Sequence, residues 1–214
     1  TYNMYINREP RFYMSVFYAG LNWIGGSNKI PEIQFYYGGN SGQTASNHNY
    51  PLTGYLPFKF QDTGFDSKNA GTATANWTAF SWPLFRYAEV LLLAAEASLQ
   101  SGNASKAAGY VNKVRDRAQL PALGNVSMDD IKKEKRLELW MEGCRYQDLI
   151  RWGDAATVLA KRGQERPALY KDGRVSWDEQ KNASAGFKSG KHELLPFPAT
   201  EMNVNKNMTQ NPGW

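Results

Sequence analysis

The sequence contains little of the chemistry on which many enzymes and metalloproteins depend. Of its 214 residues, one is cysteine and two are histidine. A single cysteine excludes an internal disulfide framework and any metal site built from several cysteines. His48 and His192 have no second histidine or carboxylate at a metal-ligand spacing, which favours a structural or exposed role for both. Nucleophile-elbow, phosphate-loop and dinucleotide-binding motifs are absent, so no cofactor is predicted.

Long apolar runs and blocks of like charge are also missing. No stretch approaches the roughly 20 apolar residues of a membrane-spanning helix, and the first residues lack a signal-peptide pattern. Because the chain begins without methionine, we expect it to be a fragment or a processed product of a longer protein. The net charge of +5 is dispersed among acidic residues, a pattern that does not predict nucleic acid binding.

Aromatic residues are concentrated at the start of the chain. Residues 1–82 hold 18 of the 29 aromatic side chains, together with several glycine-rich patches. Residues 12–18 and 33–37 are short aromatic runs typical of β-strands, and most of the remaining segment has the composition of loops. Long irregular segments in compact proteins commonly carry binding surfaces on a scaffold. We therefore predict that residues 1–82 form the ligand-facing part.

The pattern becomes helical after Pro83. Residues 84–100 are apolar almost all round, which predicts a buried helix. Residues 104–118 repeat alanine and valine with a period of 3.6. A turn of about three residues joins the two segments, so they are expected to form a helical hairpin.

A second helical hairpin is expected to follow. Ser127 and Asp130 form a capping-box signature for a helix that reaches about Glu142. The next helical pattern covers residues 145–161 with an interruption near Gly153. We therefore predict tetratricopeptide-like helical hairpins over residues 83–162.

The last part of the chain, residues 163–214, is predicted to be loop and extended segment packing back on the helices. Asp172-Gly173 favours a turn, and Leu194–Pro198 is expected to be extended because proline restricts the residue before it. Thr200 is expected to cap one short helical turn. The predicted fold is thus mostly α, with a large irregular, aromatic-rich loop part and a few short strands.

Four separated motifs, in this order, resemble the carboxy-terminal half of the SusD/RagB family of outer-membrane nutrient-binding lipoproteins. They are RYAEVLLLAAEASLQSG, VNKVRDRA, KRLELWMEGCRYQDLIRWG and LLPFPATEMNVN with TQNPGW. The earlier REPRFYMSVFYAG is similar to a family segment that precedes the last helical part. The resemblance covers most of residues 9–160 and 193–214, whereas the loops 26–80 and 164–191 match no family motif.

The resemblance implies a fold, a function and a partner. The fold would be SusD-like, and the activity would be non-catalytic binding of oligosaccharides or another nutrient at the bacterial cell surface. The partner would be a SusC-type TonB-dependent outer-membrane transporter. Family members are held at the outer membrane by a lipid anchor, which is not present in this segment. The nutrient stays open among starch, host glycan, hemicellulose and peptide.

Charged residues among the apolar helical positions allow two interpretations. Glu138 and Glu142 lie one turn apart and could be the carboxylate pair of a glycoside hydrolase. Alternatively, the charges form a buried, paired network, which is the usual state of buried charges. We favour the network, in which Glu89 and Glu96 are expected to pair with Arg86, Arg115 and Arg117. The full set is Arg86, Glu89, Glu96, Arg115, Glu138, Glu142, Arg145, Asp148, Arg151 and Trp152.

Aromatic side chains beside amides in the loops suit saccharide binding, because aromatic rings cover the apolar C–H faces of sugars and polar groups pair with hydroxyls. The candidate ligand-binding residues are Asn22, Trp23, Tyr36, Tyr37, Asn40, Tyr50 and Trp77. Asp62, Asp66 and Asn69 are a weak calcium candidate, because they miss the alternating pattern of a calcium loop. An alternative function is a helical-repeat module that binds another protein.

Overall fold

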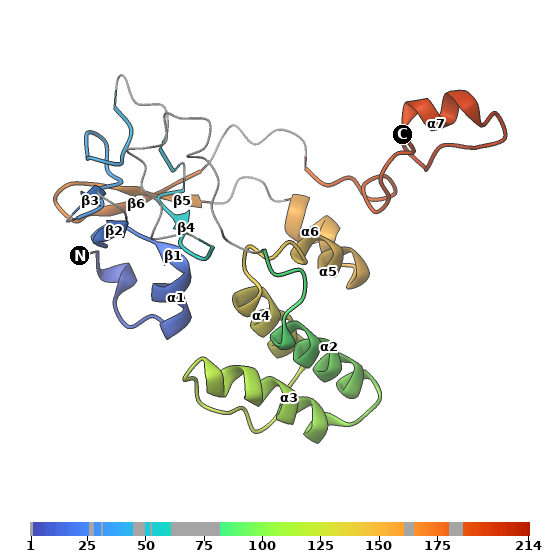
Figure 1. The fold of residues 1–214 in the computed structure, drawn as a ribbon, viewed down its shortest axis with the longest axis horizontal. Helices are drawn as coiled ribbons and strands as arrows, with labels where there is room; N and C mark the ends of the chain where they lie inside the picture. Colours follow the sequence, from blue (N-terminus) through green and yellow to red (C-terminus); the bar gives the residue numbers. More distant parts are fainter. Residues whose placement is uncertain are drawn as a thin grey trace. The chain divides into compact units, whose positions relative to one another are not determined.

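The structure is a computed structural model that describes residues 2–25, 28–30, 32–44, 50–51, 53–60, 82–160, 165–179 and 186–214. The chain divides into two compact units (Figure 1). The first comprises Thr1–Glu142 and Arg166–Asp178, and the second comprises Gly143–Glu165 and Glu179–Trp214. These boundaries do not coincide with the three segments expected from the sequence.

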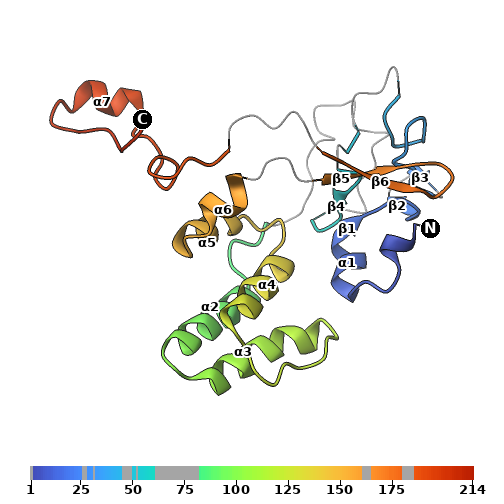
Figure 2. The ribbon, with the colours of Figure 1, turned by 180° about the vertical axis from the view of Figure 1, so that it is seen from behind.

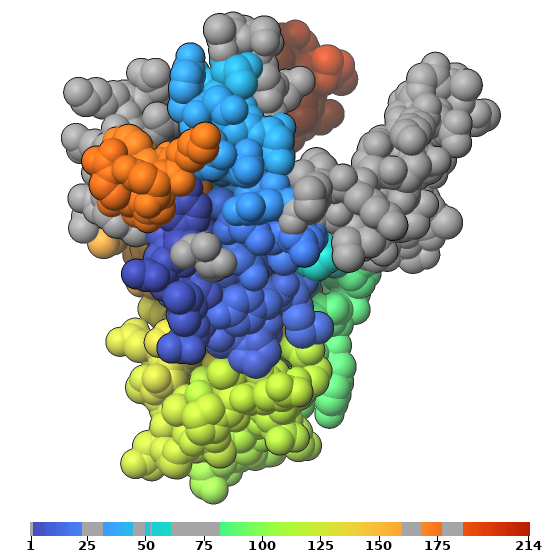
Figure 3. Space-filling view, turned by 90° about the vertical axis from the view of Figure 1, so that its left-hand side faces the viewer, coloured from blue at the N-terminus to red at the C-terminus, as the bar shows by residue number. Residues whose placement is uncertain are grey.

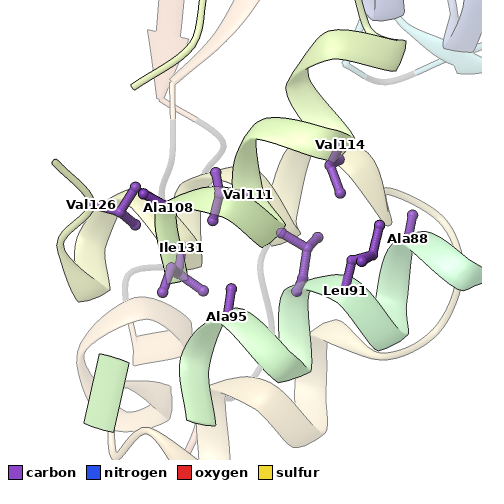
Figure 4. Close-up of a cluster of buried hydrophobic side chains, with 9 residues drawn as sticks. Ala88, Leu91, Ala95, Ala108, Val111, Val114, Val126 and Ile131 are labelled. Atoms are coloured by element: carbon purple, nitrogen blue, oxygen red, sulfur yellow. The ribbon is translucent and has the colours of Figure 1, made fainter. Parts of the chain in front are cut away.

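The first unit contains a helical hairpin of α2 (Tyr87–Gln100) and α3 (Ala104–Arg117). Gly102 adopts a positive φ of 80°, which ends α2. The Asn103 side chain accepts a hydrogen bond from the Lys106 amide and so caps α3. The two helices enclose a core of small and branched apolar side chains (Figure 4), which consists of Ala88, Leu91, Leu92, Ala95, Ala108, Val111, Val114, Val126 and Ile131.

The prediction that α2 is buried on all sides is wrong. Leu91, Leu92 and Ala95 face α3 and α4, but Tyr87, Val90 and Leu93 are exposed. Helices α3 and α4 cover only part of the circumference of α2, so the remaining apolar side chains stay at the surface of the described structure.

Helix α4 (Met128–Glu138) completes the helical core and carries a full capping box. The Ser127 hydroxyl accepts from the Asp130 amide, while the Asp130 carboxylate accepts from the Ser127 amide. The helix ends at Glu138, four residues before the predicted end at Glu142. Met141 and Gly143 take positive φ angles of 66° and 84°, which the helical conformation does not allow.

The amino-terminal part of the first unit is organised around stacked aromatic rings. A 3-10 turn, η1 (Asn3–Tyr5), is followed by α1 (Pro10–Ser15) and β1 (Val16–Phe17). The prediction of a strand over residues 12–18 is therefore wrong for most of that run. Pro10 occupies the first helical position, where its fixed φ favours a helix. The helical turn lets Phe12 pack on Tyr5 and Tyr18.

Three short two-stranded antiparallel pairs accompany this aromatic core. Strand β1 pairs with β4 (Leu56–Pro57), and β2 (Trp23–Gly25) pairs with β3 (Asn28–Ile30). Residues 33–37, also predicted as β-prone, form no strand, because residues 33–35 are irregular, residue 36 is a bend and residue 37 begins a turn. The third pair, β5 (Glu165–Leu169) and β6 (Val175–Glu179), lies where a loop was expected.

The β5–β6 hairpin joins the aromatic core through its apolar side chains. Leu169 is buried with Tyr2, Tyr5 and Ala19, and Val175 packs against the same cluster. Figures 1 and 2 both show the hairpin beside the amino-terminal strands, and Figure 3 shows it against the amino-terminal residues coloured blue. The hairpin turn is at Asp172-Gly173, as predicted, with Gly173 at a φ of 86°.

The second unit contains three short helices, α5 (Arg145–Arg151), α6 (Ala155–Ala160) and α7 (Ala199–Val204). The indole of Trp214 donates to the carbonyls of Lys191 and Leu194, which fastens the carboxy-terminal residues to the segment before α7. Thr200 does not cap α7, because the helix begins one residue earlier and Pro198 is at the N-cap.

Within the described parts of the chain, none of the helices combines the length and the hydrophobicity that crossing a membrane requires.

Candidate ligand-binding site

Tyrosine side chains from two distant segments line a cavity of about 300 Å³ in the first unit. One wall comes from described residues between Phe35 and Gly54, and the other comes from the end of β5 and the turn after it. The lining consists of Phe35, Tyr36, Tyr37, Gln43, Tyr50, Pro51, Gly54, Ala168, Leu169, Tyr170 and Lys171. We call this site the tyrosine cavity.

A tight loop presents Tyr36 and Tyr37 to the cavity. The Gly39 amide donates to the Tyr36 carbonyl at 2.9 Å, and the Gly38 amide donates to the Gln43 carbonyl at 2.8 Å. A Cβ at Gly39 would lie 2.5 Å from the carbonyl oxygen of Gln34, and a Cβ at Gly42 would overlap the Tyr36 carbonyl oxygen. The loop therefore needs glycine at both positions to close this tightly.

Asn40 supports this loop from outside the tyrosine cavity. Its amide nitrogen donates to the Glu32 carbonyl at 2.7 Å, and its side-chain oxygen accepts from the Gln34 amide at 2.9 Å. These bonds use one donor and the acceptor of the side chain. In the described structure Asn40 thus holds the loop in place and does not line the tyrosine cavity, and the ligand contact suggested by the sequence stays a prediction.

The hairpin turn places Tyr170 on the opposite wall. The Tyr170 carbonyl accepts from the Tyr2 hydroxyl at 2.7 Å, and the Tyr170 amide donates to the Arg174 carbonyl at 3.1 Å. The Arg174 guanidinium lies 4.9 Å from the centre of the Tyr170 ring and bonds to Asp172 at 2.6 Å. That hydrogen bond from Arg174 holds the pKa of the Asp172 carboxyl below its usual value. The turn is therefore held by contacts on both sides of Tyr170.

The chemistry of the tyrosine cavity suits a polyhydroxylated ligand. Tyr37 is 72% exposed and Tyr170 is 41% exposed, so both rings are available for stacking on an apolar sugar face. The Gln43 amide and the Lys171 ammonium add polar groups to the lining. Among the residues that the structure describes, no carboxylate side chain lines the cavity.

The structure brings together only some of the ligand-binding residues suggested by the sequence. Tyr36, Tyr37 and Tyr50 line the tyrosine cavity, and Asn22 is exposed but does not line it. Trp23 is described only through its backbone in β2. Trp77 and the calcium candidates Asp62, Asp66 and Asn69 lie outside the described residues.

Sequence reasoning missed Gln43, Tyr170 and Lys171, which also line the tyrosine cavity. Tyr170 is separated from Tyr37 by more than 130 residues. The only signal in the sequence was the Asp172-Gly173 turn, which indicates a hairpin but not its packing partner. In the ranges that the structure describes, histidine, cysteine and acidic residues form no group of three able to hold a metal ion.

The carboxylates considered as a catalytic pair belong to a buried ion network. Arg86 binds Glu142 through two hydrogen bonds of 2.7 Å and reaches Glu138 at 3.0 Å. Arg117 donates to both oxygens of Glu138 at 2.7 Å, and Lys59 binds Glu142. Burial acts to raise the pKa of the Glu142 carboxyl, but the hydrogen bonds from Arg86 and Lys59 outweigh it and hold the pKa below its usual value.

Glu134 and Arg11 extend this network to α1, and the sequence analysis included neither of them. Arg11 donates to Glu134 at 2.7 Å, to Glu138 at 3.1 Å and to Glu9 at 3.0 Å. Arg115 binds the other oxygen of Glu134 at 2.9 Å. All carboxylate oxygens of Glu134, Glu138 and Glu142 therefore accept a bond from a cation, an arrangement that supports a structural role for the three carboxylates.

The expected pairing of Glu89 and Glu96 with the arginines is not the one observed. Arg86, Arg115 and Arg117 bind the carboxylates of α4 and its end, as described above. Glu96 is buried, and the Gln100 amide lies 3.4 Å from its carboxylate. Glu89 is partly exposed on the first turn of α2.

The remaining charged residues of the predicted network belong to the second unit. Asp148 is buried in α5 and accepts from Arg151 at 3.0 Å. The guanidinium groups of Arg151 and Arg145 lie 4.8 Å and 6.0 Å from the Trp152 ring. The charges predicted as one network thus belong to two different compact units.

The model of the SusD family matches residues 1–214, so the chain belongs to this family. It is 30% identical over 158 residues to the starch-binding protein SusD of Bacteroides thetaiotaomicron, a match that covers 73% of this chain and 25% of that protein. It is also similar to SusD-like protein P2 of Formosa agariphila, with 34% identity over 143 residues, 60% of this chain and 25% of that protein.

Solved structures agree with this assignment. A SusD-like protein from Bacteroides fragilis NCTC 9343 matches with a TM-score of 0.79 at 26% identity, covering 99% of this chain and 40% of that one. A SusD-like protein described as laminarin-binding has a TM-score of 0.54 at 30% identity over 78% of this chain and 30% of its own length. The family resemblance and the mostly α, SusD-like fold are therefore confirmed. The chain spans about a quarter of the length of the sequence relatives cited above.

Proposed function

We propose that the protein to which this chain belongs binds oligosaccharides at the bacterial cell surface without catalysing their cleavage. Membership of the SusD family supports a carbohydrate ligand. The names of two relatives, one starch-binding and one laminarin-binding, favour a glucan. The observation that carries the proposal is the tyrosine cavity, in which aromatic rings from two segments surround a space of about 300 Å³.

Binding without catalysis is supported by the state of the carboxylates. Glycoside hydrolysis needs two carboxyl groups beside the scissile bond, one of them able to donate a proton. Glu138 and Glu142 instead accept hydrogen bonds from Arg86, Arg117 and Lys59, so their oxygens already bind cations of the chain itself. For Glu142, the bonds from Arg86 and Lys59 favour the ionised form.

Uptake is proposed to occur through a SusC-type TonB-dependent transporter in the outer membrane. The family and its implied location support this partner. Contact with the membrane is proposed to be made through a lipid anchor outside residues 1–214. Co-purification of the full-length parent protein with a TonB-dependent transporter from outer membranes tests this part. Recovery of the parent protein in the soluble fraction without a transporter would contradict it.

The binding proposal is tested by calorimetry and affinity electrophoresis with the full-length parent protein. The ligand panel consists of starch, laminarin and xylan oligosaccharides, host glycans and peptides. Tyr37→Ala and Tyr170→Ala are each expected to weaken binding at least about fivefold, because each removes an exposed ring from the lining. Tyr87→Ala is the matched control, since Tyr87 is 70% exposed on α2 and lies outside the tyrosine cavity.

Two outcomes contradict the proposal. One is that no glycan in the panel binds the parent protein. The other is that Tyr87→Ala weakens glycan binding as much as Tyr37→Ala, which would show that the tyrosine cavity is not the site.

Contact with another protein is the second candidate function, and one observation favours it. Phe85, Tyr87, Val90 and Leu93 expose large apolar side chains at the start of α2 and on one of its faces, and such patches commonly mark protein interfaces. A variant with Val90→Asp and Leu93→Asp should keep glycan binding if the tyrosine cavity is the ligand site. Loss of glycan binding in this folded variant, with binding retained in Tyr37→Ala, would favour the helical surface instead.

A further inference from the structure

A second and larger cavity lies between the amino-terminal segment and α4. It measures about 760 Å³ and shares no lining residue with the tyrosine cavity. All of its lining residues belong to the first compact unit. They are Asn7, Arg8, Glu9, Arg11, Phe12, Ser15, Val16, Lys133, Arg136, Leu137 and Trp140. We call this site the basic cleft.

One wall of the basic cleft is a stripe of side chains on α4 and the turn that follows it. Lys133, Arg136 and Leu137 follow one another at steps of three and one residues along α4, and Trp140 lies in the turn after the helix. Residues at this spacing share one face of a helix. The stripe therefore combines two cations with an aliphatic side chain and an indole.

The cations of this stripe are available to a ligand. Lys133 and Arg136 are exposed, and neither forms an ion pair with any residue that the structure describes. On the opposite wall Arg8 is exposed, and its guanidinium donates to the Met4 carbonyl at 2.8 Å. A carbonyl carries no net charge, so within the described part of the chain Arg8 has no acidic residue as an ion-pair partner.

The acidic residue in the lining does not neutralise these charges. Glu9 binds Arg11 at 3.0 Å, and Arg11 is itself paired with Glu134 and Glu138 of the buried network. Arg8, Lys133 and Arg136 thus remain as an excess of positive charge around the basic cleft. The buried Nε–H of Arg11 also lacks a hydrogen-bond acceptor among the described residues.

Apart from Asn7 and Ser15, the rest of the lining is apolar and partly aromatic. Phe12 and Val16 come from the amino-terminal segment, and Leu137 and Trp140 come from the α4 stripe. A ring with an apolar face and an anionic substituent matches this combination, because the ring covers the indole and the cations pair with the substituent.

From this geometry we propose that the basic cleft binds an acidic sugar unit, whose carboxylate or sulfate group pairs with Lys133 and Arg136. The inference rests on the proposed function, since it takes the ligand to be a saccharide. It adds a second site and a ligand class, so the parent protein should bind acidic glycans through a site that neutral glycans do not require.

Calorimetry with the full-length parent protein tests this inference. The probes are an oligogalacturonate and one β-glucan in its unsulfated and sulfated forms. In the double variant Lys133→Gln/Arg136→Gln, binding of at least one acidic probe should weaken about tenfold, whereas binding of the neutral glucan should stay unchanged. The affinity of the wild type for that acidic probe should also fall as salt is added, and the affinity of the variant should depend less on the salt concentration.

The matched control is Lys106→Gln/Lys113→Gln, which removes the same charge from α3. Neither residue lines the basic cleft. Equal losses of acidic-glycan binding in the two double variants would show an effect of net charge alone and would overturn the inference. The galacturonate and sulfated probes separate the two kinds of anion.

Two further outcomes also decide the matter. If the neutral glucan binds the parent protein and neither acidic probe depends on Lys133 and Arg136, this inference fails while the proposed function stands. If no glycan binds at all, the proposed function fails as well.

Acylation of the lysine side chains of the parent protein, followed by mass spectrometry, provides an independent readout. Reaction at Lys106 with complete protection of Lys133 would show that other parts of the protein fill the basic cleft, and that result would also overturn the inference.

Discussion

Replacing Arg11 by methionine should destabilise the protein more than the loss of any single surface ion pair. The Arg11 side chain is 8% exposed, and those of its partners Glu134 and Glu138 are 4% and 2% exposed. Methionine keeps much of the apolar stem but removes the cation that bonds to Glu134 at 2.7 Å and to Glu138 at 3.1 Å. Both carboxylates then stay buried with one cation fewer.

The expected cost is about 3–5 kcal/mol of unfolding free energy, which is typical when one member of a buried ion pair is removed. Arg115 still binds Glu134, and Arg86 and Arg117 still bind Glu138, so the lower half of that range is expected. Urea denaturation of the full-length parent protein measures the loss as a lower midpoint at an unchanged slope.

Two variants control this experiment. Arg174→Met removes an ion pair whose side chains are 73% and 55% exposed, and it should change the midpoint very little because water screens such pairs. Arg11→Met combined with Glu134→Gln should recover part of the lost stability, because the second change removes one of the carboxylates that lost a cation. The reasoning is refuted if Arg11→Met costs no more than Arg174→Met, or if the double variant is less stable than the sum of the single changes.

Two other predictions follow from the structure. Glu142 has a folded-state pKa below its ordinary value of 4.5, so its ion pairs stabilise the protein fully above pH 4.5, and this contribution is lost as the pH falls through the lower, folded pKa. In urea melts at several pH values, Glu142→Gln should therefore lose less stability below pH 4.5 than the wild type does. An unchanged dependence of stability on pH would contradict this role of Glu142. Gly42→Ala should weaken glycan binding at least about fivefold, because a Cβ would overlap the Tyr36 carbonyl and displace the loop. The control is Gly109→Ala in α3, where a Cβ meets no atom within 4 Å. This variant should leave glycan binding intact and raise the free energy of unfolding by about 0.5–1 kcal/mol.

The helical part was predictable because its signals are local. The 3.6-residue period of alanine and valine predicted α3, and Ser127 with Asp130 predicted the start of α4. Capping and periodicity act within one or two turns, so they are visible in the sequence alone. The same local reasoning failed at residues 12–18, where Pro10 favours a helix and packing of Phe12 on Tyr5 and Tyr18 accompanies it.

The ion network was predictable only in part. Glu138 and Glu142 were recognised as charges that need partners, but Arg86, which binds both of them, was expected to pair with Glu89 and Glu96. Arg117 of α3 is another partner, and the two most distant ones, Arg11 and Lys59, are separated from the carboxylates that they bind by 127 and 83 residues. No helical spacing connects residues that far apart, so only the folded chain shows which cation binds which carboxylate.

The amino-acid sequence determined the kinds of structure and the kinds of side chain present in this protein. The order of the residues fixes the helix periods, the capping residues and the SusD family motifs. It also places many tyrosines in the loops. Tertiary structure decided which of these tyrosines meet. Tyr36, Tyr37 and Tyr50 surround a common space only because the β5–β6 hairpin packs Leu169 into the aromatic core and thereby brings Tyr170 to the opposite wall. Burial of apolar side chains joins segments without regard to their separation in sequence, which is why the tyrosine cavity became visible only in the folded protein.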